Sequence, residues 1–516
     1  MAKTRLSLYS SYYPDTRVDS AAVTNYGGIF PYLDLMLLTG LSKSADDLLP
    51  GSHLNGWRPS QYLSALLAMN LTGGDCVDDL AKLESDAGIE LYMSVISHSI
   101  GADSKRFRRG GDRSFPSLTS MREWLENYHN DEEDGKRGYG SAFIPSPNDA
   151  LRGLREVNRR FASVAHDLMQ KRGDRCVSRA TLEIDATFVE TQKRDALRCY
   201  KKFDAYSGLT VRWNETGMVI WEELRDGNVP PSYRNAEALE ESIRWLNEKR
   251  GVKDIWVRSD SAAHQADVLR TLSEWKMAGE ACPVKFAIGY VKSREFREAV
   301  QKVPNGEWTS MGEDRACSRY EVAEVTYVSN KEALMKAPPF RHIVVRRACE
   351  QGTLPGLGAR EDESGDEETM EIRGRSYHIH AIVSNIEGWS AREIAEWRNE
   401  RCGHGEAVHS ILKSDLAGGQ LPSNRFGVNA AWWSIVVLAH NLHALLEMLA
   451  LPTNLVGSRF KRLRFHLINV PARLVLHSRR CMVRYFQPAA WRIVRDIRIA
   501  LEAFSPSKGL IASASM

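Results

Sequence analysis

The sequence predicts an α/β fold in which a helical N-terminal region precedes a mixed α/β core, a β-rich insertion interrupts that core, and a basic helical C-terminus follows. Apolar residues recur at helical spacing up to about residue 150. Strand patterns followed by helical patterns occupy residues 179–288, and from about 292 to 385 strand patterns are separated by turns. A chain of 516 residues exceeds one ordinary hydrophobic core, so we expect about two to four domains.

The composition is typical of a soluble globular protein. Hydrophobic residues make up 43% and charged residues 26% of the chain, which excludes disorder of the whole sequence. The net charge of +3 indicates little about partners, but its distribution is uneven. Residues 459–498 hold eleven Lys or Arg and one acid, Asp496. This asymmetry predicts a C-terminal region that binds a polyanion.

Neither secretion nor membrane insertion is indicated by the sequence. The eight cysteines form no C-x-x-C pair and no Cys/His cluster at zinc spacing, so we expect reduced thiols in a cytoplasmic protein. The N-terminus lacks the basic-then-apolar layout of a signal peptide. The apolar run 430–451 is interrupted by polar residues and is shorter than a bilayer requires, which favours a buried helix over a membrane span.

The N-terminal region should be mainly helical. Residues 29–38 and 62–71 have apolar side chains at helical spacing, and residues 116–125 open with helix-start residues. The acidic, Gly-rich stretch 131–141 is predicted to be a loop or linker.

The core should begin with a strand at residues 181–187. Leu182, Ile184 and Ala186 alternate with Glu183 and Asp185, so the two acids share one face. Further strands are expected at 209–213, 219–221, 254–261 and 284–288, with helices at 235–249 and 265–275. In the insertion, strands are expected at 320–328, 340–346 and 377–383, and helices should resume at Ser390 and continue to about Leu451.

Three acidic positions are candidates for metal-dependent chemistry on phosphodiesters. Asp185 is expected near the end of the first strand, with Glu183 able to support it, although two acids on a strand face are more often simply solvated. Asp260 ends a buried strand, where open α/β sheets place ligands, or else it caps the helix near Gln265. On a helix, Glu406 and Lys413 would lie two turns apart on one polar face, a pattern that an ordinary amphipathic helix also shows.

The chain resembles the DDE transposases of bacterial insertion sequences, in the thirteen-eighty branch related to the insertion-sequence-four superfamily. Three motifs carry the resemblance: Leu182-Glu183-Ile184-Asp185-Ala186-Thr187, Val257-Arg258-Ser259-Asp260-Ser261, and residues 405–419 around Glu406 and Lys413. Residues 421–432 are also similar to this group, so the resemblance extends over about residues 27–484. Each motif is weak alone, but their order and spacing are specific.

The resemblance implies an RNase H-like core in which Asp185, Asp260 and Glu406 bind two Mg²⁺ ions, for which Mn²⁺ would substitute. Two such ions about 4 Å apart can serve the attacking and leaving oxygens of a phosphodiester, and hard Mg²⁺ prefers oxygen ligands. The implied reaction is cleavage at transposon ends followed by strand transfer into target DNA. The implied partners are double-stranded DNA, as terminal inverted repeats and target, and a second copy of the chain in a homodimer on paired ends in the bacterial nucleoid.

The resemblance also implies DNA contacts. Glu406 and Lys413 fit the E-x6-K part of the family signature Y-x2-R-x3-E-x6-K, whereas Arg401 lies five residues before Glu406 instead of four, and position 398 is Arg instead of Tyr. The expected DNA-binding residues are listed together: Lys413, Arg401, Arg225, Lys461, Arg462 and Arg464. Trp308 or Trp389 would stack on an unpaired base or, more commonly, pack in a core.

The resemblance and the patterns together divide the chain into five expected segments. These are a helical DNA-end-binding region, 1–150; the first part of the core, 175–291; the β-rich insertion, 292–385; the second part of the core with Glu406, 386–450; and the basic C-terminal region, 451–516. Two alternatives remain: a nuclease with the same core that hydrolyses without joining, and a domesticated DNA-binding protein that no longer transposes.

Overall fold

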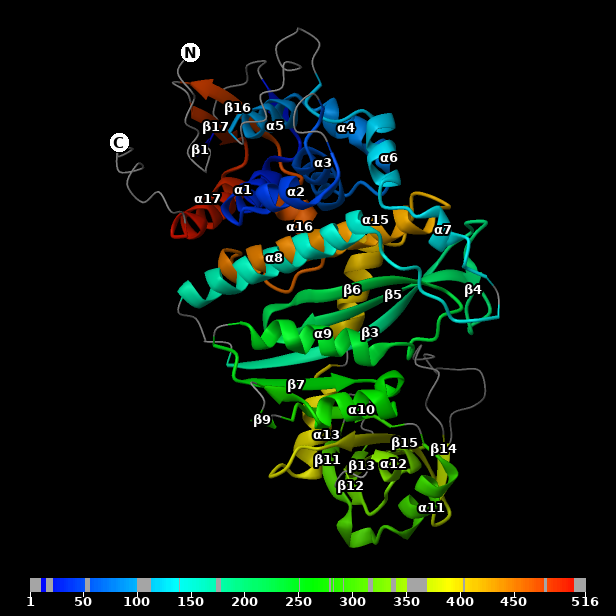
Figure 1. The fold of residues 1–516 in the computed structure, drawn as a ribbon. Coiled ribbons are helices and arrows are strands. Elements are labelled where there is room, and N and C mark those ends of the chain that lie inside the picture. The colour runs from blue at the N-terminus through cyan, green and yellow to red at the C-terminus, as the bar shows by residue number, and fades with distance from the viewer. Residues whose placement is uncertain are drawn as a thin grey trace. The chain divides into compact units, whose positions relative to one another are not determined.

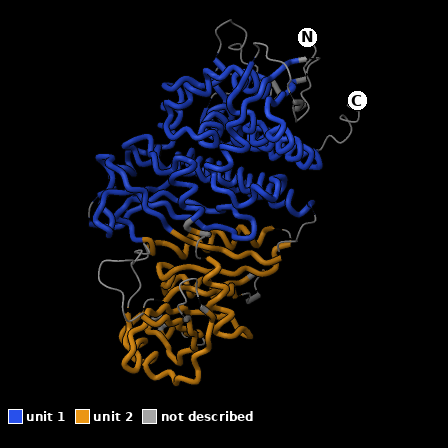
Figure 2. The backbone as a smooth tube through the Cα atoms, turned by 180° about the vertical axis from the view of Figure 1, so that it is seen from behind, with its two compact units in different colours: residues 1–176, 186–230, 407–516 blue, residues 177–185, 231–406 orange. Residues whose placement is uncertain are grey.

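The computed structural model describes residues 11–14, 22–51, 56–99, 113–138, 140–172, 178–249, 251–277, 280–281, 283–290, 292–313, 319–335, 340–349, 369–401, 404–477 and 480–504. The chain forms two compact units that interleave in the sequence (Figure 2). The first unit contains residues 1–176, 186–230 and 407–516, and the second contains residues 177–185 and 231–406.

Helices dominate the first unit, in agreement with the expected helical N-terminal region. The described N-terminal α-helices are α1 (Phe30–Leu38), α2 (Leu41–Leu48), α3 (Pro59–Thr72), α4 (Leu80–Glu84), α5 (Ala87–Ser99), α6 (Leu118–Glu126), α7 (Asp131–Asp134) and α8 (Asp149–Arg172). The sequence explains where α6 begins, because the Ser117 hydroxyl accepts the N–H of Ser120 as a helix N-cap. The acidic stretch 131–141, expected as a loop, begins with the short helix α7, since Asn130 caps its first turn and acids favour a helix N-terminus. The described residues after Asp134 in this stretch lie outside regular helices and strands, as expected.

The first unit also contains β-structure. Strands β5 (Asp204–Trp213) and β6 (Met218–Asp226) form an antiparallel hairpin, and β4 (Leu197–Arg198) pairs with the start of β5. A separate four-stranded sheet has the order β1-β17-β16-β2, from β1 (Ser11–Pro14), β2 (Val23–Thr24), β16 (Ala472–His477) and β17 (Arg480–Tyr485). The C-terminal region, expected to be helical, therefore also contains two strands, where Val475, Val483 and Tyr485 favour extended structure.

The centre of the first unit is α15 (Phe426–Leu449), which is buried on nearly every side. It runs beside α8 in Figure 1 and packs against β6 and α3. A helix that is apolar all round belongs in a protein interior, which agrees with the expectation of a buried helix here. The remaining elements of this unit's C-terminal part are α16 (Phe460–Leu463), a π-helical segment (Arg464–Ile468) and α17 (Pro488–Glu502). No helix among the described residues is long and apolar enough to cross a membrane.

The second unit is built on a mixed sheet with the order β11-β12-β13-β15-β10-β7-β3, and β14 pairs with β15. Its strands are β7 (Asp254–Ser259), β10 (Lys285–Gly289), β11 (Thr309–Glu313), β12 (Arg319–Val325), β13 (Arg341–Ala348), β14 (Thr369–Ile372), β15 (Arg375–Ser384) and the first part of β3 (Arg179–Glu190). Strands β3, β7 and β10 are mutually parallel, whereas β10, β15, β13, β12 and β11 pair antiparallel. The parallel strands therefore come from the expected core and most antiparallel strands from the expected insertion.

The described part of the second unit also contains the α-helices α9 (Asn235–Asn247), α10 (Ala266–Ser273), α11 (Arg294–Lys302), α12 (Asn330–Met335) and α13 (Ala391–Asn399). The insertion is thus β-rich but includes two helices, α11 and α12. Ser390 and Glu393 form a capping box at α13, which explains why the helical pattern resumes there. Buried residues of β7, β10, β12, β13 and β15 pack with Ile394 and Trp397 of α13 into one core.

Candidate active site

Asp185 and Asp260 lie on neighbouring parallel strands of the second unit. Strands β3 and β7 pair with Glu183 opposite Arg258 and Ile184 opposite Ser259. Asp185 and Asp260 are the next residues along each strand, so the pairing brings the two aspartates together. Asp260 follows the last residue of β7, as expected, whereas β3 continues to Glu190, so Asp185 does not end its strand.

Arg401 connects the two aspartates. Its Nη2 lies 2.7 Å from Asp185 Oδ2 and 3.9 Å from Asp260 Oδ2. The Arg401 side chain is only 14% exposed, so the guanidinium is held at this position and not spread into solvent. The residue that the family signature placed at a shifted spacing therefore meets both aspartates.

The two oxygens of Asp260 have different partners. Oδ1 accepts the N–H of Ala262 at 3.0 Å, which caps a short 3-10 helix at Ser261–Ala263. Oδ2 is the oxygen nearest Arg401. The capping role expected as an alternative is present, but it serves this 3-10 turn instead of the helix near Gln265, and it leaves Oδ2 near Arg401.

The local field at Asp260 disfavours a second negative charge. Loss of surrounding water raises the pKa of Asp260, the nearby Asp185 carboxylate raises it further, and Arg401 opposes both effects. Two neighbouring carboxylates that repel each other form a site that a cation stabilises. Because carboxylate oxygens are the donors that Mg²⁺ prefers, this donor set fits a divalent metal.

The third acid, Glu406, belongs to α14 (His404–Ser410), whose backbone begins near Asp185. Glu406 lies in this helix, and its side chain is outside the described residues. Gly405, the residue before Glu406, lies close to Asp185. A Cβ built on Gly405 would be 3.5 Å from Asp185 Oδ2. The first turn of α14 therefore reaches Asp185.

An ion network centred on the buried Arg258 supports this site. Arg258, only 1% exposed, donates to Glu183 at 2.7 Å, to Glu400 at 2.9 Å and to the Trp397 carbonyl at 2.6 Å. The network joins β3 and β7 to the end of α13, one residue before Arg401. Sequence reasoning gave Glu183 a supporting role but missed Arg258. The available signal was that each residue lies two positions before an aspartate, on the same face of its strand.

Lys413 lies in a π-helical segment, Ile411–Asp415, that follows α14. Glu406 and Lys413 would share one face of a continuous α-helix, but the wider π turn changes that spacing. Within the first unit, Lys413 Nζ donates to the Phe188 carbonyl of β3 at 3.3 Å. The lysine is thus tied to the backbone of the strand that carries Asp185, three residues further on.

The structure separates the remaining expected DNA-binding residues. Lys461 and Arg462 are exposed, as a DNA contact requires. Arg464 instead donates to the carbonyls of Asn70 and Leu71, where it caps the end of α3. Arg225 is buried and pairs with Glu223 at 2.7 Å, which favours a structural role over contact with DNA.

An acid beside Arg225 and the two tryptophans considered above also have structural partners. Asp226, the residue after Arg225, accepts two hydrogen bonds from Arg137, at 2.7 and 2.8 Å. Trp308 is 8% exposed, with the Arg346 guanidinium 3.7 Å from its ring centre. Trp389 packs 5.0 Å from Trp256. Both tryptophans follow the packed alternative.

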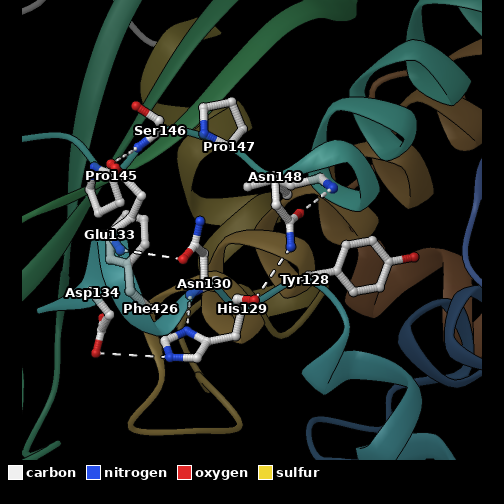
Figure 3. A pocket seen from close by; sticks show the side chains of 12 residues that line it. Tyr128, His129, Asn130, Glu133, Asp134, Pro145, Ser146, Pro147, Asn148 and Phe426 are labelled. Carbon is white, nitrogen blue, oxygen red and sulfur yellow. Dashed lines mark hydrogen bonds and ion pairs between the residues drawn. The ribbon is translucent and has the colours of Figure 1, made fainter.

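Two further features resemble sites but are satisfied internally. Among the described residues, Asp75, Cys76 and Asp79 form one group with three possible metal ligands, but Asp79 already accepts the N–H groups of Asp75 and Cys76. A small pocket beside the start of α15 is lined by His129, Glu133 and Phe426 (Figure 3). Glu133 accepts the N–H of Ser146 there, and His129 Nδ1 accepts that of Gly427, so the pocket's polar groups hold the loop together.

Comparisons with known proteins bear on this arrangement. Curated proteins give no match. Among solved structures, the cryo-EM structure of a piggyBac transposase synaptic complex with hairpin DNA is similar, with a TM-score of 0.38 and 11% identity over 93% of this chain and 83% of that chain. Residues 367–501 match the family model described as transposase DDE domain group 1. The matched segment contains Arg401, Glu406 and Lys413.

Proposed function

We propose that this protein cuts DNA at the ends of a mobile element and joins them to target DNA, with Asp185, Asp260 and Glu406 as metal ligands. The observation that carries the proposal is the meeting of Asp185, Asp260 and Arg401 beside the first turn of α14. The family match over residues 367–501 supports it independently, because it covers the segment that supplies Arg401 and Glu406.

The core is proposed to be RNase H-like, with the thirteen-eighty branch of bacterial insertion sequences as the specific group. The parallel strands β3, β7 and β10, with an aspartate on each of the first two, support this fold. The antiparallel strands β11–β15, which lie between α10 and α13 in the sequence, support an insertion placed before the glutamate.

Two Mg²⁺ ions, when bound, would supply charge neutralisation at the phosphate and at the attacking and leaving oxygens. Asp185 and Asp260 would hold them on the sheet, and Glu406 would add a ligand from the start of α14. Asp260 would use Oδ2, because Oδ1 is engaged by Ala262. Arg401 and Lys413 would hold phosphate oxygens, Arg401 with a planar fork of donors and Lys413 as a point charge.

The proposal is tested with Asp185→Asn, Asp260→Asn and Glu406→Gln, each of which removes a charge with little change in shape. Each variant should lose Mg²⁺-dependent cleavage of a labelled element end by several orders of magnitude and keep its affinity for that end. Asp254→Asn is the matched control, because Asp254 is an exposed acid at the opposite end of β7. Full cleavage by any one variant would remove that acid from the proposed site.

The same assay separates the alternatives. Products joined to a target plasmid support transposition, cleavage without joining indicates a nuclease, and end binding without either reaction indicates a domesticated DNA-binding protein. Because one active site serves one DNA end, we propose a homodimer on paired ends. The mass of the complex on DNA would measure this directly, and a single copy on two paired ends would contradict it.

A further inference from the structure

The connection between β3 and β5 in the first unit is a concentrated basic surface. Residues 191–203 contain five Lys or Arg and one acid: Lys193, Arg194, Arg198, Lys201, Lys202 and Asp195. Asp195 already pairs with Arg194 at 3.0 Å, and Arg194, Arg198, Lys201 and Lys202 are exposed. The acid therefore leaves most of the positive charge of this connection facing solvent.

Tyr200 projects from the tip of this connection. Its side chain is 66% exposed, which is unusual for a large aromatic residue. The turn beneath it is well defined, because Cys199 N–H donates to the Phe203 carbonyl at 2.8 Å and Lys202 N–H donates to the Cys199 carbonyl at 2.9 Å. Arg198 also donates to the Lys202 carbonyl at 2.6 Å. The tyrosine is thus displayed on an ordered turn.

Two aromatic residues pack beside Tyr200. The rings of Tyr200 and Phe188 meet edge to face with 5.5 Å between their centres, and those of Phe188 and Phe203 do so at 6.0 Å. The carbonyl of Phe188 accepts the hydrogen bond from Lys413. Lys413 and Tyr200 therefore contact the same residue of β3, which links this connection to the phosphate contact proposed above.

We propose that residues 191–203, which we call the basic turn, bind DNA beside Lys413, with Tyr200 stacking on an unpaired base. Lysines and arginines attract the phosphate backbone regardless of sequence. An exposed aromatic ring among such cations provides a stacking surface for single-stranded nucleotides, whose π-faces are accessible only when the base is unpaired. The inference rests on the proposed function, because the unpaired base would belong to a DNA end held by Lys413.

The stacking part is tested by binding, without metal, of two short duplexes of arbitrary sequence, one blunt and one with an unpaired overhang that carries 2-aminopurine. Tyr200→Ala should weaken binding of the overhang duplex by roughly tenfold, abolish quenching of 2-aminopurine and leave blunt-duplex affinity unchanged. Tyr200→Phe should retain both properties, since it keeps the ring. Tyr233→Ala, another exposed tyrosine, is the control.

The phosphate part is tested with Lys201→Ala/Lys202→Ala. This double variant should weaken binding of both duplexes and lower the slope of log affinity against log salt by about 1.5. Lys253→Ala/Lys302→Ala removes the same charge from exposed positions outside the basic turn and should change neither.

Two outcomes would overturn the inference. One is a Tyr200→Ala protein that melts as the wild type does and binds the overhang duplex equally well. The other is an equal loss on both duplexes, which would make Tyr200 a duplex contact or a structural residue. Because these measurements need neither metal nor cleavage, they are independent of the Asp185, Asp260 and Glu406 variants. Normal cleavage by those variants would contradict the proposed function without affecting the binding result.

Discussion

Arg401 Nη2 lies 2.7 Å from Asp185 Oδ2, so a cation of the protein itself balances a carboxylate that we assign to metal binding. The same guanidinium is 3.9 Å from Asp260. A divalent ion bound by these two aspartates would compete with Arg401 for the same oxygen. Arg401 would then be released from Asp185 when metal binds, and its donors would become available to a phosphate.

The first prediction follows from this competition. Arg401→Gln should raise the affinity of the DNA-free protein for Mn²⁺ by roughly tenfold, because one competing charge is removed from the site. The same variant should bind cleaved DNA ends less tightly. Isothermal titration calorimetry measures the metal affinity, with Arg392→Gln as the control, since Arg392 is an exposed arginine on α13 that pairs with Glu396. Unchanged or weaker Mn²⁺ binding by Arg401→Gln would show that the guanidinium does not compete.

The second prediction concerns the buried partner of Glu183. Arg258→Met should lower the free energy of unfolding by about 3–5 kcal/mol, because it leaves the Glu183 carboxylate, 4% exposed, without its cation. Glu183→Leu/Arg258→Met should recover much of that loss, since neither charge remains buried. Chemical denaturation of the wild type, the two single variants Glu183→Leu and Arg258→Met, and the double variant measures the coupling as a double-mutant cycle. Additive losses would mean that the pair is not coupled.

The Arg258 network also shows what alternation alone can predict. The pattern at 181–187 correctly placed Leu182 and Ile184 on one face, and both are buried. The pattern left open whether Glu183 and Asp185 were solvated, because it does not show which residues pack on the face that carries them. Glu183 proves to be buried against Arg258, a residue 75 positions away. Local periodicity gives the face of a side chain, and long-range pairing decides its environment.

The other differences between the expected and the observed structure arise either from local strand preferences or from contacts between residues far apart in the sequence. The extension of β3 to Glu190 could have been predicted, because Thr187, Phe188 and Val189 all favour strands. The buried pair of Arg137 and Asp226, 89 residues apart, could not, since no spacing in the sequence relates them. Several cations of the basic C-terminal run are likewise used inside the first unit, as Arg464 caps α3 and Arg498 pairs with Glu502. Counting charges along the chain therefore overstates the exposed basic surface there.

The third prediction tests how closely α15 packs on the β5–β6 hairpin. A Cβ on Gly208 of β5 would lie 2.2 Å from Cζ2 of Trp433, which is fully buried on α15 and has no room to move. Gly208→Ala should therefore lower the free energy of unfolding by about 2 kcal/mol or more. Gly138→Ala is the matched control, because an added Cβ meets nothing within 4 Å there. A thermal melt that ranks the two variants equally would contradict this packing.

The fourth prediction concerns two buried histidines on α15. Burial lowers the pKa of His440 to about 4, against a smaller opposing effect from its hydrogen bond with the Gly217 carbonyl. Burial also lowers the pKa of His443 to about 3, and His440 contributes to that shift. His443 Nδ1 lies 3.0 Å from the Tyr32 hydroxyl, so both rings are engaged in the core as neutral groups.

These shifts fix the sign of the pH dependence. In the unfolded chain a histidine takes up a proton near pH 6.5, whereas folded His440 stays neutral down to about pH 4. Between these values the unfolded state binds more protons, so stability falls as the pH is lowered, by up to about 1.4 kcal/mol per pH unit for each histidine.

Denaturation at a series of pH values from 7.5 to 4.5 should show this slope in the unit that contains α15. His440→Gln should reduce the slope by up to about 1.4 kcal/mol per pH unit, which corresponds to one proton. Glutamine can donate to the Gly217 carbonyl without titrating. His466→Gln, which changes an exposed histidine, should leave the slope as it is. If His440→Gln instead loses stability as steeply as the wild type between pH 6.5 and 4.5, then proton uptake at His440 does not control unfolding by acid.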